Sequence, residues 1–415
     1  TSIEWYDFFL YGAAAALIFP TAFFGEMPPT TALLLSLLTF AAGFIARPIG
    51  GIIFGHFGDK VGRKKTLISA LMLMGISSTL IGLLPTYAMI GVAAPILLTT
   101  LRFAQGLAIG GQWGGAMLLV TESAPSDQRG YYGAFAQAGA PIGVILANLA
   151  LIITSALVSE EFFNTWGWRI PFLASAVLIL ISMYIQLNLE DTDAFKALVD
   201  NKDTQSDENI KKSPVVEAIR KYPKRIFLAA GAFLSVQVTF YILIAFMLAY
   251  GVTSANMARD DMLAAVLIAS AIMVPVQFIF SSYSDRHGRK GIFMSGAVLT
   301  GIWAFAIFPL VDTGNFYLIV LAITGGLVFL AMMYGPQAAF FTELFSTEVR
   351  YSGATLGYQF GAIVGGAFAP TIAVKLWTEF DIIWVSAYIA LASLLTLLSV
   401  MALTETYQSD LNNTD

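Results

Sequence analysis

At residues 55–65 the sequence reads Gly-His-Phe-Gly-Asp-Lys-Val-Gly-Arg-Lys-Lys, and at residues 281–290 it reads Ser-Ser-Tyr-Ser-Asp-Arg-His-Gly-Arg-Lys. Each segment follows a long apolar run, and each places an aspartate four residues before the arginine of a Gly-Arg-Lys triplet. The spacing is the same although half of the chain separates the two segments. Such internal repetition predicts that the fold contains the same group of helices twice.

The apolar content of the chain indicates that its main solvent is lipid. Of the 415 residues, 57% are hydrophobic and 12% are charged, a balance that a single water-soluble core does not need. A membrane-spanning helix takes about 20 apolar residues. We therefore predict an all-α membrane protein with twelve transmembrane helices in two pseudo-symmetric six-helix bundles. The spans are placed at 1–24, 30–57, 66–86, 92–122, 130–158, 169–188, 226–254, 262–283, 291–311, 316–343, 350–377 and 382–404.

A charged segment separates the two halves. Acidic residues followed by lysines and arginines fill 190–225, which we interpret as a cytoplasmic linker with an amphipathic surface helix. The N-terminal bundle then covers 1–189, and 226–415 forms the C-terminal bundle with a short cytoplasmic tail. Most of the 22 lysines and arginines fall in loops after even-numbered spans, which places both termini in the cytoplasm. Because Thr1 already lies in an apolar run, we expect a short cytoplasmic segment before it and see no signal peptide.

Several motifs carry a resemblance to a known family. The two loops quoted above resemble the signature loop of the major facilitator superfamily. Six further motifs resemble its metabolite:proton symporter family, which includes shikimate, α-ketoglutarate and proline/betaine transporters. They are Ile-Glu-Trp-Tyr-Asp-Phe at 3–8, Ala-Arg-Pro-Ile-Gly-Gly at 46–51, Leu-Arg-Phe-Ala-Gln-Gly at 101–106, Gly-Gly-Gln-Trp-Gly-Gly at 110–115, Trp-Gly-Trp-Arg-Ile-Pro-Phe at 166–172 and Glu-Leu-Phe-Ser-Thr-Glu-Val-Arg at 343–350. The resemblance implies a multi-pass transporter of a bacterial inner membrane.

Two positions depart from that family. The family usually has glutamate where this chain has Gln112, which argues against a proton-carrying role for this position. The second signature loop opens with Ser281 in place of glycine, which weakens a close helix contact there.

Four ionisable residues lie within the predicted spans: Glu4, Asp7, Arg47 and Arg102. A charge at mid-membrane costs about 2.5–3.5 kcal/mol on insertion scales, so each of them needs a partner or a function. By resemblance, spans 1, 4, 7 and 10 line a central cavity, which brings Asp7 within reach of Arg102. Our hypothesis is that Arg102 alternates between Asp7 and a substrate carboxylate, which couples substrate binding to protonation. The alternative is a static ion pair between the two spans.

The other two charges are interpreted differently. Glu4 lies three residues before Asp7, on nearly the same helix face, and is either a second proton site or a carboxylate at the aqueous entrance. Arg47 precedes Pro48, where we expect a kink. We expect Arg47 to form a structural ion pair near the cytoplasmic side.

Neutral polar and aromatic residues are expected to surround the cavity and to bind substrate together with Arg102. Since they carry almost no charge in the second half, the pattern favours a small carboxylated or polyhydroxylated substrate. For any single residue, a hydrogen bond between helices is the alternative. The candidates are Tyr6, Tyr11, Gln105, Gln112, Trp113, Gln137, Asn148, Gln237, Tyr241, Gln277, Tyr334, Gln337, Tyr358 and Gln359.

The repeated loops are interpreted as gates. Asp59 and Asp285 are placed where a carboxylate can face a helix N-terminus. Arginines near these loops can pair with Glu122 and Glu343 across the cytoplasmic entrance and favour the outward-facing state. The arginines are Arg63, Arg129, Arg289 and Arg350. The alternative is that these charges serve only to set topology.

The combined interpretation is a secondary active transporter that carries a small organic anion with protons by alternating access. A proton-independent uniporter and a symporter of a zwitterion such as betaine or proline are the alternatives. The interpretation as a channel is disfavoured because the repeat and the gating loops are typical of a transporter. The interpretation as an enzyme is disfavoured because no catalytic cluster is visible in the sequence. We expect no cofactor or metal, no nucleic-acid partner at a net charge of −5, and a monomer whose partners are lipid, protons and the substrate.

Overall fold

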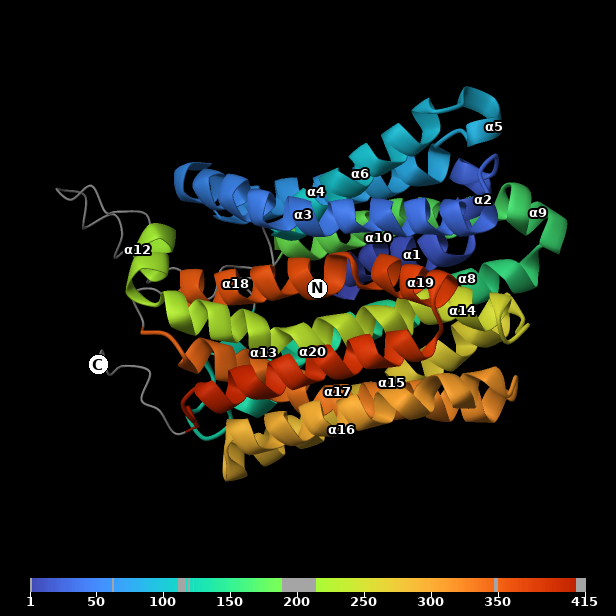
Figure 1. The fold of residues 1–415 in the computed structure, drawn as a ribbon. Coiled ribbons are helices and arrows are strands. Elements are labelled where there is room, and N and C mark those ends of the chain that lie inside the picture. Colours follow the sequence, from blue (N-terminus) through green and yellow to red (C-terminus); the bar gives the residue numbers. More distant parts are fainter. Residues whose placement is uncertain are drawn as a thin grey trace.

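The computed structural model describes residues 2–61, 63–110, 117, 120–121, 123–188, 214–346 and 350–407, with side chains left undescribed at 55–61, 63–64, 185–186, 214–215, 217 and 351. The helices of the first half run through α1 (Ser2–Leu17), α2 (Phe19–Phe24), α3 (Pro29–Val61), α4 (Arg63–Leu83), α5 (Tyr87–Ile90), α6 (Ala93–Gly110), α8 (Arg129–Leu157), α9 (Glu160–Thr165) and α10 (Ile170–Asn188), with a 3₁₀ turn η1 at Gly167–Arg169. All regular structure in the described residues is helical (Figure 1).

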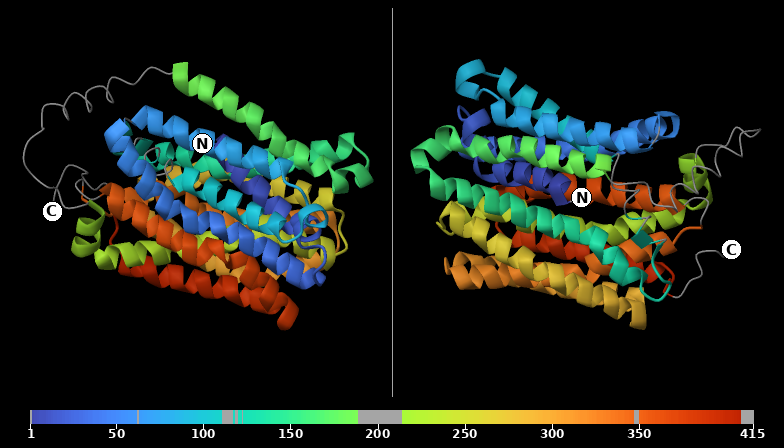
Figure 2. Two further views of the ribbon diagram at one scale, coloured as in Figure 1. Left: turned by 90° about the horizontal axis from the view of Figure 1, so that it is seen from above. Right: turned by 180° about the vertical axis from the view of Figure 1, so that it is seen from behind.

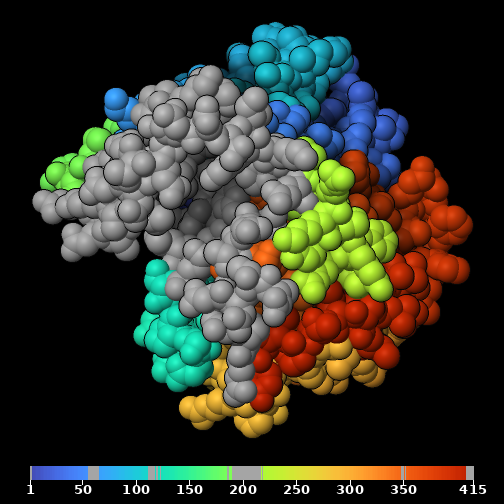
Figure 3. Space-filling view, turned by 90° about the vertical axis from the view of Figure 1, so that its left-hand side faces the viewer, coloured from blue at the N-terminus to red at the C-terminus, as the bar shows by residue number. Residues whose placement is uncertain are grey.

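The second half repeats the arrangement. Its elements are α12 (Pro214–Lys221), α13 (Pro223–Tyr241), η2 (Ile242–Phe246), α14 (Met247–Thr253), α15 (Arg259–His287), α16 (Arg289–Asp312), α17 (Phe316–Glu343), α18 (Arg350–Gly361), η3 (Ala362–Ala367), α19 (Ala369–Glu379) and α20 (Ile383–Ala402). The short α12 lies within the range expected for the linker and against the helix ends of the second half (Figure 3). We call this end of the molecule the α12 end.

The helices account for the predicted twelve-span architecture. Within the described residues, eleven helical segments are long and apolar enough to cross a membrane. The remaining span is α1, whose 16 residues are continued by α2 after a break at Ile18. The prediction of an all-α fold with two six-helix bundles is therefore confirmed.

Two spans contain π-helical turns that the hydropathy pattern does not predict. They are η2, between α13 and α14, and η3, between α18 and α19. The longer repeat of a π-turn shifts the side chains that follow onto a different face, and such turns occur frequently at functional sites. Both turns contact the first half of the chain, η2 through α1 and η3 through α3.

The two halves meet along α8 and α15, which lie side by side in the right-hand view of Figure 2. Polar contacts join them at several levels. The Gln277 amide donates to the Ala134 carbonyl at 3.3 Å, and the Asn148 amide donates to the Leu263 carbonyl at 3.1 Å. Near the opposite end from α12, the Ser155 hydroxyl donates to Asp260 at 2.8 Å. This seam therefore holds the bundles together over most of its length.

Within the first bundle, small residues bring α3 and α6 into backbone contact. A Cβ atom at Gly106 would lie 2.1 Å from the carbonyl oxygen of Gly43, and one at Gly110 would lie 1.9 Å from that of Arg47. Only glycine fits where backbones approach this closely. The crossing matters for the site because it fixes the two arginines of these helices relative to one another.

This crossing gives a stability prediction. Gly106→Ala forces α3 and α6 apart and should lower stability by about 1–3 kcal/mol, the usual cost of overpacking a close contact. Gly291→Ala is the matched control, because a Cβ there meets nothing within 4 Å and alanine favours the helix. Thermal unfolding of the purified variants checks the pair, and equal midpoints would contradict the close contact.

Candidate functional site

The centre of the molecule holds two buried arginines on either side of one aromatic ring. Arg47 of α3 and Arg102 of α6 are 1% and 0% exposed. The Cζ atom of Arg47 lies 4.3 Å from the centroid of the Phe8 ring, and that of Arg102 lies 3.9 Å from it. The negative face of an aromatic ring attracts a guanidinium, so Phe8 of α1 stabilises both cations at once.

Arg102 is enclosed within the first bundle. Besides Phe8, its guanidinium lies over the rings of Tyr11 and Phe40, at 4.4 Å and 4.6 Å. Nη1 donates to Oε1 of Gln105 at 3.1 Å, and longer contacts reach the carbonyls of Phe8 at 3.5 Å and Phe40 at 3.4 Å. These neighbours all belong to α1, α3 and α6. Among the described residues, none of these hydrogen bonds or ring contacts reaches the second half, although Tyr241 of α13 lies close enough to interact electrostatically.

Asp7 faces another part of the bundle. It is buried, and its Oδ1 accepts a hydrogen bond from the Ser175 hydroxyl of α10. The Ser78 hydroxyl of α4 also interacts with this carboxyl group, while Oδ2 has no hydrogen-bond partner among the described residues. Within that part of the chain, the carboxyl group is therefore solvated by two hydroxyls and by no cation.

The expected direct contact of Asp7 with Arg102 is not formed, and this expectation is corrected. Successive residues of a helix point about 100° apart, so Phe8 faces Arg102 while Asp7 turns toward α4 and α10. Gln105 links the two sites, because its Nε2 donates to Ser78 at 2.8 Å while its Oε1 accepts from Arg102. Asp7 and Arg102 are thus connected through Gln105 and Ser78.

The surroundings of Arg47 differ from the ion pair that we expected. Among the described residues, none of its three guanidinium nitrogens has a hydrogen-bond partner of normal geometry, and no ion pair joins it to a described carboxylate. The expected structural ion pair is therefore not formed within the part of the chain that the structure describes. Aromatic rings of Trp5, Phe8 and Phe44 replace the missing acid. Its place near the middle of the 33-residue α3 was the signal in the sequence.

The second bundle faces Arg47 with phenol groups. Tyr241 of α13 and Tyr358 of α18 interact with the guanidinium. The Tyr241 ring packs against Phe44 at a centroid distance of 4.9 Å. Arg47 therefore lies where the two bundles meet, with hydroxyl groups on the side opposite its own helix.

A small cavity of about 20 Å³ lies beside these tyrosines. That volume is enough for about one water molecule. Four of the predicted substrate-binding residues line it: Gln237, Tyr241, Tyr334 and Tyr358. The first bundle contributes Trp5, Phe9 and Ala140. The cavity therefore lies where the two bundles meet.

Among the described residues, the other predicted binding residues do not line this cavity. Tyr6 donates to the Pro171 carbonyl at 2.6 Å, and the Tyr11 hydroxyl lies 2.6 Å from that of Thr39, so both are used inside the first bundle. The Gln137 amide donates to the Tyr334 carbonyl at 3.1 Å and so joins the bundles. Both polar side-chain atoms of Gln337, and one of Gln359, are buried without a partner. Gln112 and Trp113 lie outside the described residues.

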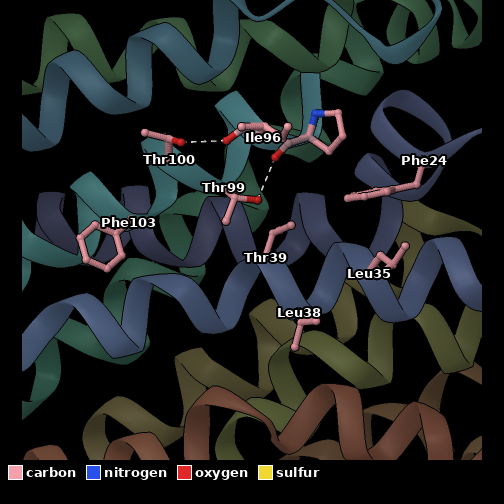
Figure 4. A pocket seen from close by; sticks show the side chains of 9 residues that line it. Phe24, Leu35, Leu38, Thr39, Ile96, Thr99, Thr100 and Phe103 are labelled. Carbon is pink, nitrogen blue, oxygen red and sulfur yellow. Dashed lines mark hydrogen bonds between the residues drawn. The ribbon is translucent and has the colours of Figure 1, made fainter. Parts of the chain in front are cut away.

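A larger groove of about 660 Å³ lies on the outer surface of the first bundle. Its wall is mostly apolar, with Phe24, Leu35, Leu38, Ile96 and Phe103 among its residues (Figure 4). The Thr99 and Thr100 hydroxyls donate to carbonyls of their own helix, at Pro95 and Ile96. Because Leu38 and Ile96 are exposed on a membrane-spanning surface, lipid fits this groove better than a polar solute does.

At the α12 end, charged groups of the repeated loop join the bundles. Asp285 accepts hydrogen bonds from the backbone N–H groups of Gly130 and Tyr131, at 2.7 Å and 2.8 Å. These residues form the first turn of α8, where the helix dipole favours a carboxylate. Arg289 holds Asp285 at 2.6 Å and Glu343 at 3.0 Å. The second loop therefore links α15, α16 and α17 to α8.

The remaining predicted gate residues complete this cluster in part. Arg129 approaches Glu343 at 3.9 Å across the bundles. Arg350 donates to the carbonyls of Thr342 and Phe345. The gate predictions for Glu122, and for the side chains of Asp59 and Arg63, fall outside the described residues.

Glu405 was not among the predicted gate residues. Burial raises the pKa of Glu405, but hydrogen bonds from the N–H groups of Lys290, Arg289, Tyr407 and Thr406 outweigh it and lower the pKa overall. The Thr406 hydroxyl donates to Glu343 at 2.8 Å. The Glu405 carboxylate therefore binds the start of α16 and attaches the segment after α20 to the gate cluster.

Comparison with known proteins identifies the family. The family model described as Major Facilitator Superfamily matches residues 2–356. An inner membrane metabolite transport protein of Escherichia coli K12 is 40% identical over 99% of this chain and 93% of its own length. The shikimate transporter of the same organism is 37% identical over 94% and 88%. Its proline/betaine transporter is 33% identical over 93% and 78%.

Solved structures agree on the fold. A crystal structure of a D-xylose–proton symporter superposes with a TM-score of 0.75, covering 98% of each chain at 16% identity. At that identity the likeness speaks for the fold alone. The family model and the curated relatives show that the chain belongs to the major facilitator superfamily, among its metabolite, shikimate and proline/betaine transporters, and is a multi-pass membrane transporter of metabolites and not an enzyme.

Proposed function

We propose that this transporter carries a small organic anion together with protons across a bacterial inner membrane by alternating access, with both termini in the cytoplasm. The observation that supports the proposal most is the distribution of buried charge. Arg47 and Arg102 share the Phe8 ring, whereas Asp7 is solvated by hydroxyls only. A buried cation without a paired acid is costly, and a substrate anion removes that cost.

Asp7 is the proposed proton carrier. The charged group that interacts with it directly is Glu4 on the same helix, while α4 and α10 contribute the hydroxyls of Ser78 and Ser175. Arg102 on α6 is connected to it through Gln105 and Ser78. When Asp7 is ionised, its negative charge offsets part of the field of the two arginines. When it is protonated, that field is uncompensated and favours a bound anion. Proton and anion therefore bind better together than separately, which is the requirement for symport.

The role of Arg102 in this proposal changes from the one expected from sequence. Its guanidinium is enclosed by α1, α3 and α6, so it senses Asp7 through Gln105 and Ser78 and need not exchange partners. Glu4 is partly exposed on the same face of α1 and is the proposed second proton site.

The gate cluster supports alternating access. Asp285 holds the first turn of α8, and Arg129 and Arg289 approach Glu343 from both bundles. Breaking these contacts separates the bundles at the α12 end, the proposed cytoplasmic end, while the central site keeps its position. The contacts therefore favour the state that is closed on this side.

Two other transport modes remain as alternatives. A uniporter would move the same substrate with no proton and would ignore a protonophore. A symporter of a zwitterion is suggested by the proline/betaine relatives. The excess of buried positive charge favours an anion over both betaine and proline, since each of these carries its own cation.

The first prediction concerns Asp7. Asp7→Asn imitates the protonated acid, so substrate exchange across proteoliposomes should continue while accumulation driven by a pH gradient falls to the level without the gradient. Glu379→Gln is the control, because Glu379 belongs to an exposed ion pair with Lys375 on α19. Accumulation equal to wild type in Asp7→Asn would exclude Asp7 as the coupling group.

The second prediction concerns the gate. Asp285→Asn removes the charge that holds the first turn of α8, and should shift the protein toward the state open at the α12 end. The chain has no cysteine, so a cysteine at Ala338, which is buried against Gly133, reports the separation of α8 from α17. Maleimide labelling should become several-fold faster, because the loss of a charge-assisted hydrogen bond costs about 1.5–3 kcal/mol.

The matched comparison for the gate is the same cysteine with Glu379→Gln, which should label at the wild-type rate. A labelling rate unchanged by Asp285→Asn would show that these hydrogen bonds do not hold the gate closed.

A further inference from the structure

We propose that Arg47 binds the carboxylate of the substrate, assisted by the hydroxyls of Tyr241 and Tyr358, and that the site selects monocarboxylates with a neutral polar body. This inference rests on the proposed function, because it names the group that receives the transported anion. Arg47 is 1% exposed, and among the described residues its guanidinium has no hydrogen bond of normal geometry, although Tyr241 and Tyr358 lie close enough to interact with it. A planar guanidinium is suited to bind a carboxylate through two parallel hydrogen bonds.

The position of Arg47 distinguishes it from Arg102. Arg102 is held by Gln105 and two backbone carbonyls inside the first bundle. Among the described residues, Arg47 has no hydrogen bond of normal geometry, and it interacts with tyrosines of the other bundle that line the central cavity. A substrate that displaces these tyrosines therefore reaches Arg47 without breaking an ion pair.

The aromatic groups around Arg47 suit this role. Phe8, Phe44 and Trp5 stabilise the cation while the site is empty, which lowers the cost of burying it without an acid. They offer no acceptor that competes with an incoming carboxylate. The phenol groups of Tyr241 and Tyr358 can donate to the carboxylate once the bundles part.

Unpartnered amides define the rest of the ligand. Gln337 lies one turn after the cavity-lining Tyr334 on α17. Among the described residues, neither polar side-chain atom of Gln337 has a hydrogen bond, and buried polar groups are normally paired. Gln237 lines the cavity itself. A ligand with hydroxyl or carbonyl groups beside its carboxylate satisfies these amides, whereas a plain hydrocarbon acid does not.

The charges also set limits on the ligand. A dicarboxylate needs a second cationic side chain that the ligand can reach. Among the described residues, the candidate is Arg102, which is enclosed within the first bundle. A quaternary ammonium would approach Arg47 through the same rings and be repelled by it. The site therefore favours a single negative charge over both two charges and a zwitterion.

The empty site is too small for such a ligand. The cavity that Tyr241 and Tyr358 line is about 20 Å³ and has room for about one water. Because Arg47 does not line this cavity, the two tyrosines must move away from Arg47 when the ligand enters. Both lie in spans that contain π-helical turns, η2 after Tyr241 and η3 after Tyr358. These irregular turns give the second bundle a place where it can adjust to the ligand.

The test is ligand binding to the purified full chain by isothermal titration calorimetry at mildly acidic pH. The probes are shikimate, quinate and 3-hydroxybenzoate, each beside its methyl ester, together with α-ketoglutarate and glycine betaine. Wild type should bind at least one monocarboxylate and reject its ester. Arg47→Gln should weaken that binding by about tenfold or more, because a hydrogen bond to a charged group is lost, and should no longer distinguish acid from ester.

Arg169→Gln is the matched control. Arg169 is also buried, but it donates to the carbonyls of Gly82 and Leu84, away from the cavity, and its removal should leave affinity within about twofold. Thermal unfolding reports whether each variant is folded. If Arg47→Gln does not fold, Arg47→Lys replaces it: a point charge should retain weaker binding to the acid and still reject the ester.

The outcomes separate the two proposals. If monocarboxylates bind and Arg47→Gln binds them as tightly as wild type, the inference about Arg47 is wrong while anion transport stands; loss of binding in Arg102→Gln alone would then assign the carboxylate to Arg102. Tighter binding of α-ketoglutarate than of every monocarboxylate overturns the selection for a single charge. If only glycine betaine binds, or no acid does, both this inference and the proposed function are overturned.

Discussion

The arrangement of Phe8 between two guanidinium groups is the constraint on which the central site depends. Two like charges in a membrane interior repel one another and need compensation. One aromatic ring contacts both cations, and Asp7, the next residue on the helix, is placed by that geometry against α4 and α10 instead. The interior therefore carries an excess of positive charge that neither helix bundle neutralises by itself.

The rest of the molecule holds this charge in place and controls access to it. Glycine contacts bring α3 and α6 together and so fix the separation of Arg47 and Arg102. The seam of α8 and α15 joins the bundles, and the loop around Asp285 closes the α12 end through backbone N–H groups. Rigid contacts within each bundle and polar contacts between bundles are the combination that alternating access requires.

The fold could be predicted because hydropathy and the internal repeat can be read directly from the sequence, and the structure shows the spans that they predict. The positions of the site residues could be predicted only in part. Tyr241, Tyr334 and Tyr358 line the central cavity, although their role in binding substrate stays a prediction, whereas Asp7 and Arg102, although on the expected spans, turn away from each other. Assigning a residue to a span does not tell which neighbouring helix its side chain faces. On α1, a shift of one residue decides whether a side chain contacts α6 or α10. Arg47 was expected to pair with an acid, but its neighbours are aromatic rings, which no charge pattern reveals.

Proton uptake on anion binding tests the central claim most directly. Calorimetry of one bound monocarboxylate, repeated near neutral pH in buffers of different ionisation enthalpy, counts the protons that the protein takes up per anion. Coupling through Asp7 predicts uptake approaching about one proton per anion, and about none in Asp7→Asn. An anion that binds wild type with no proton uptake across the neutral range would contradict the link between the buried acid and the two arginines.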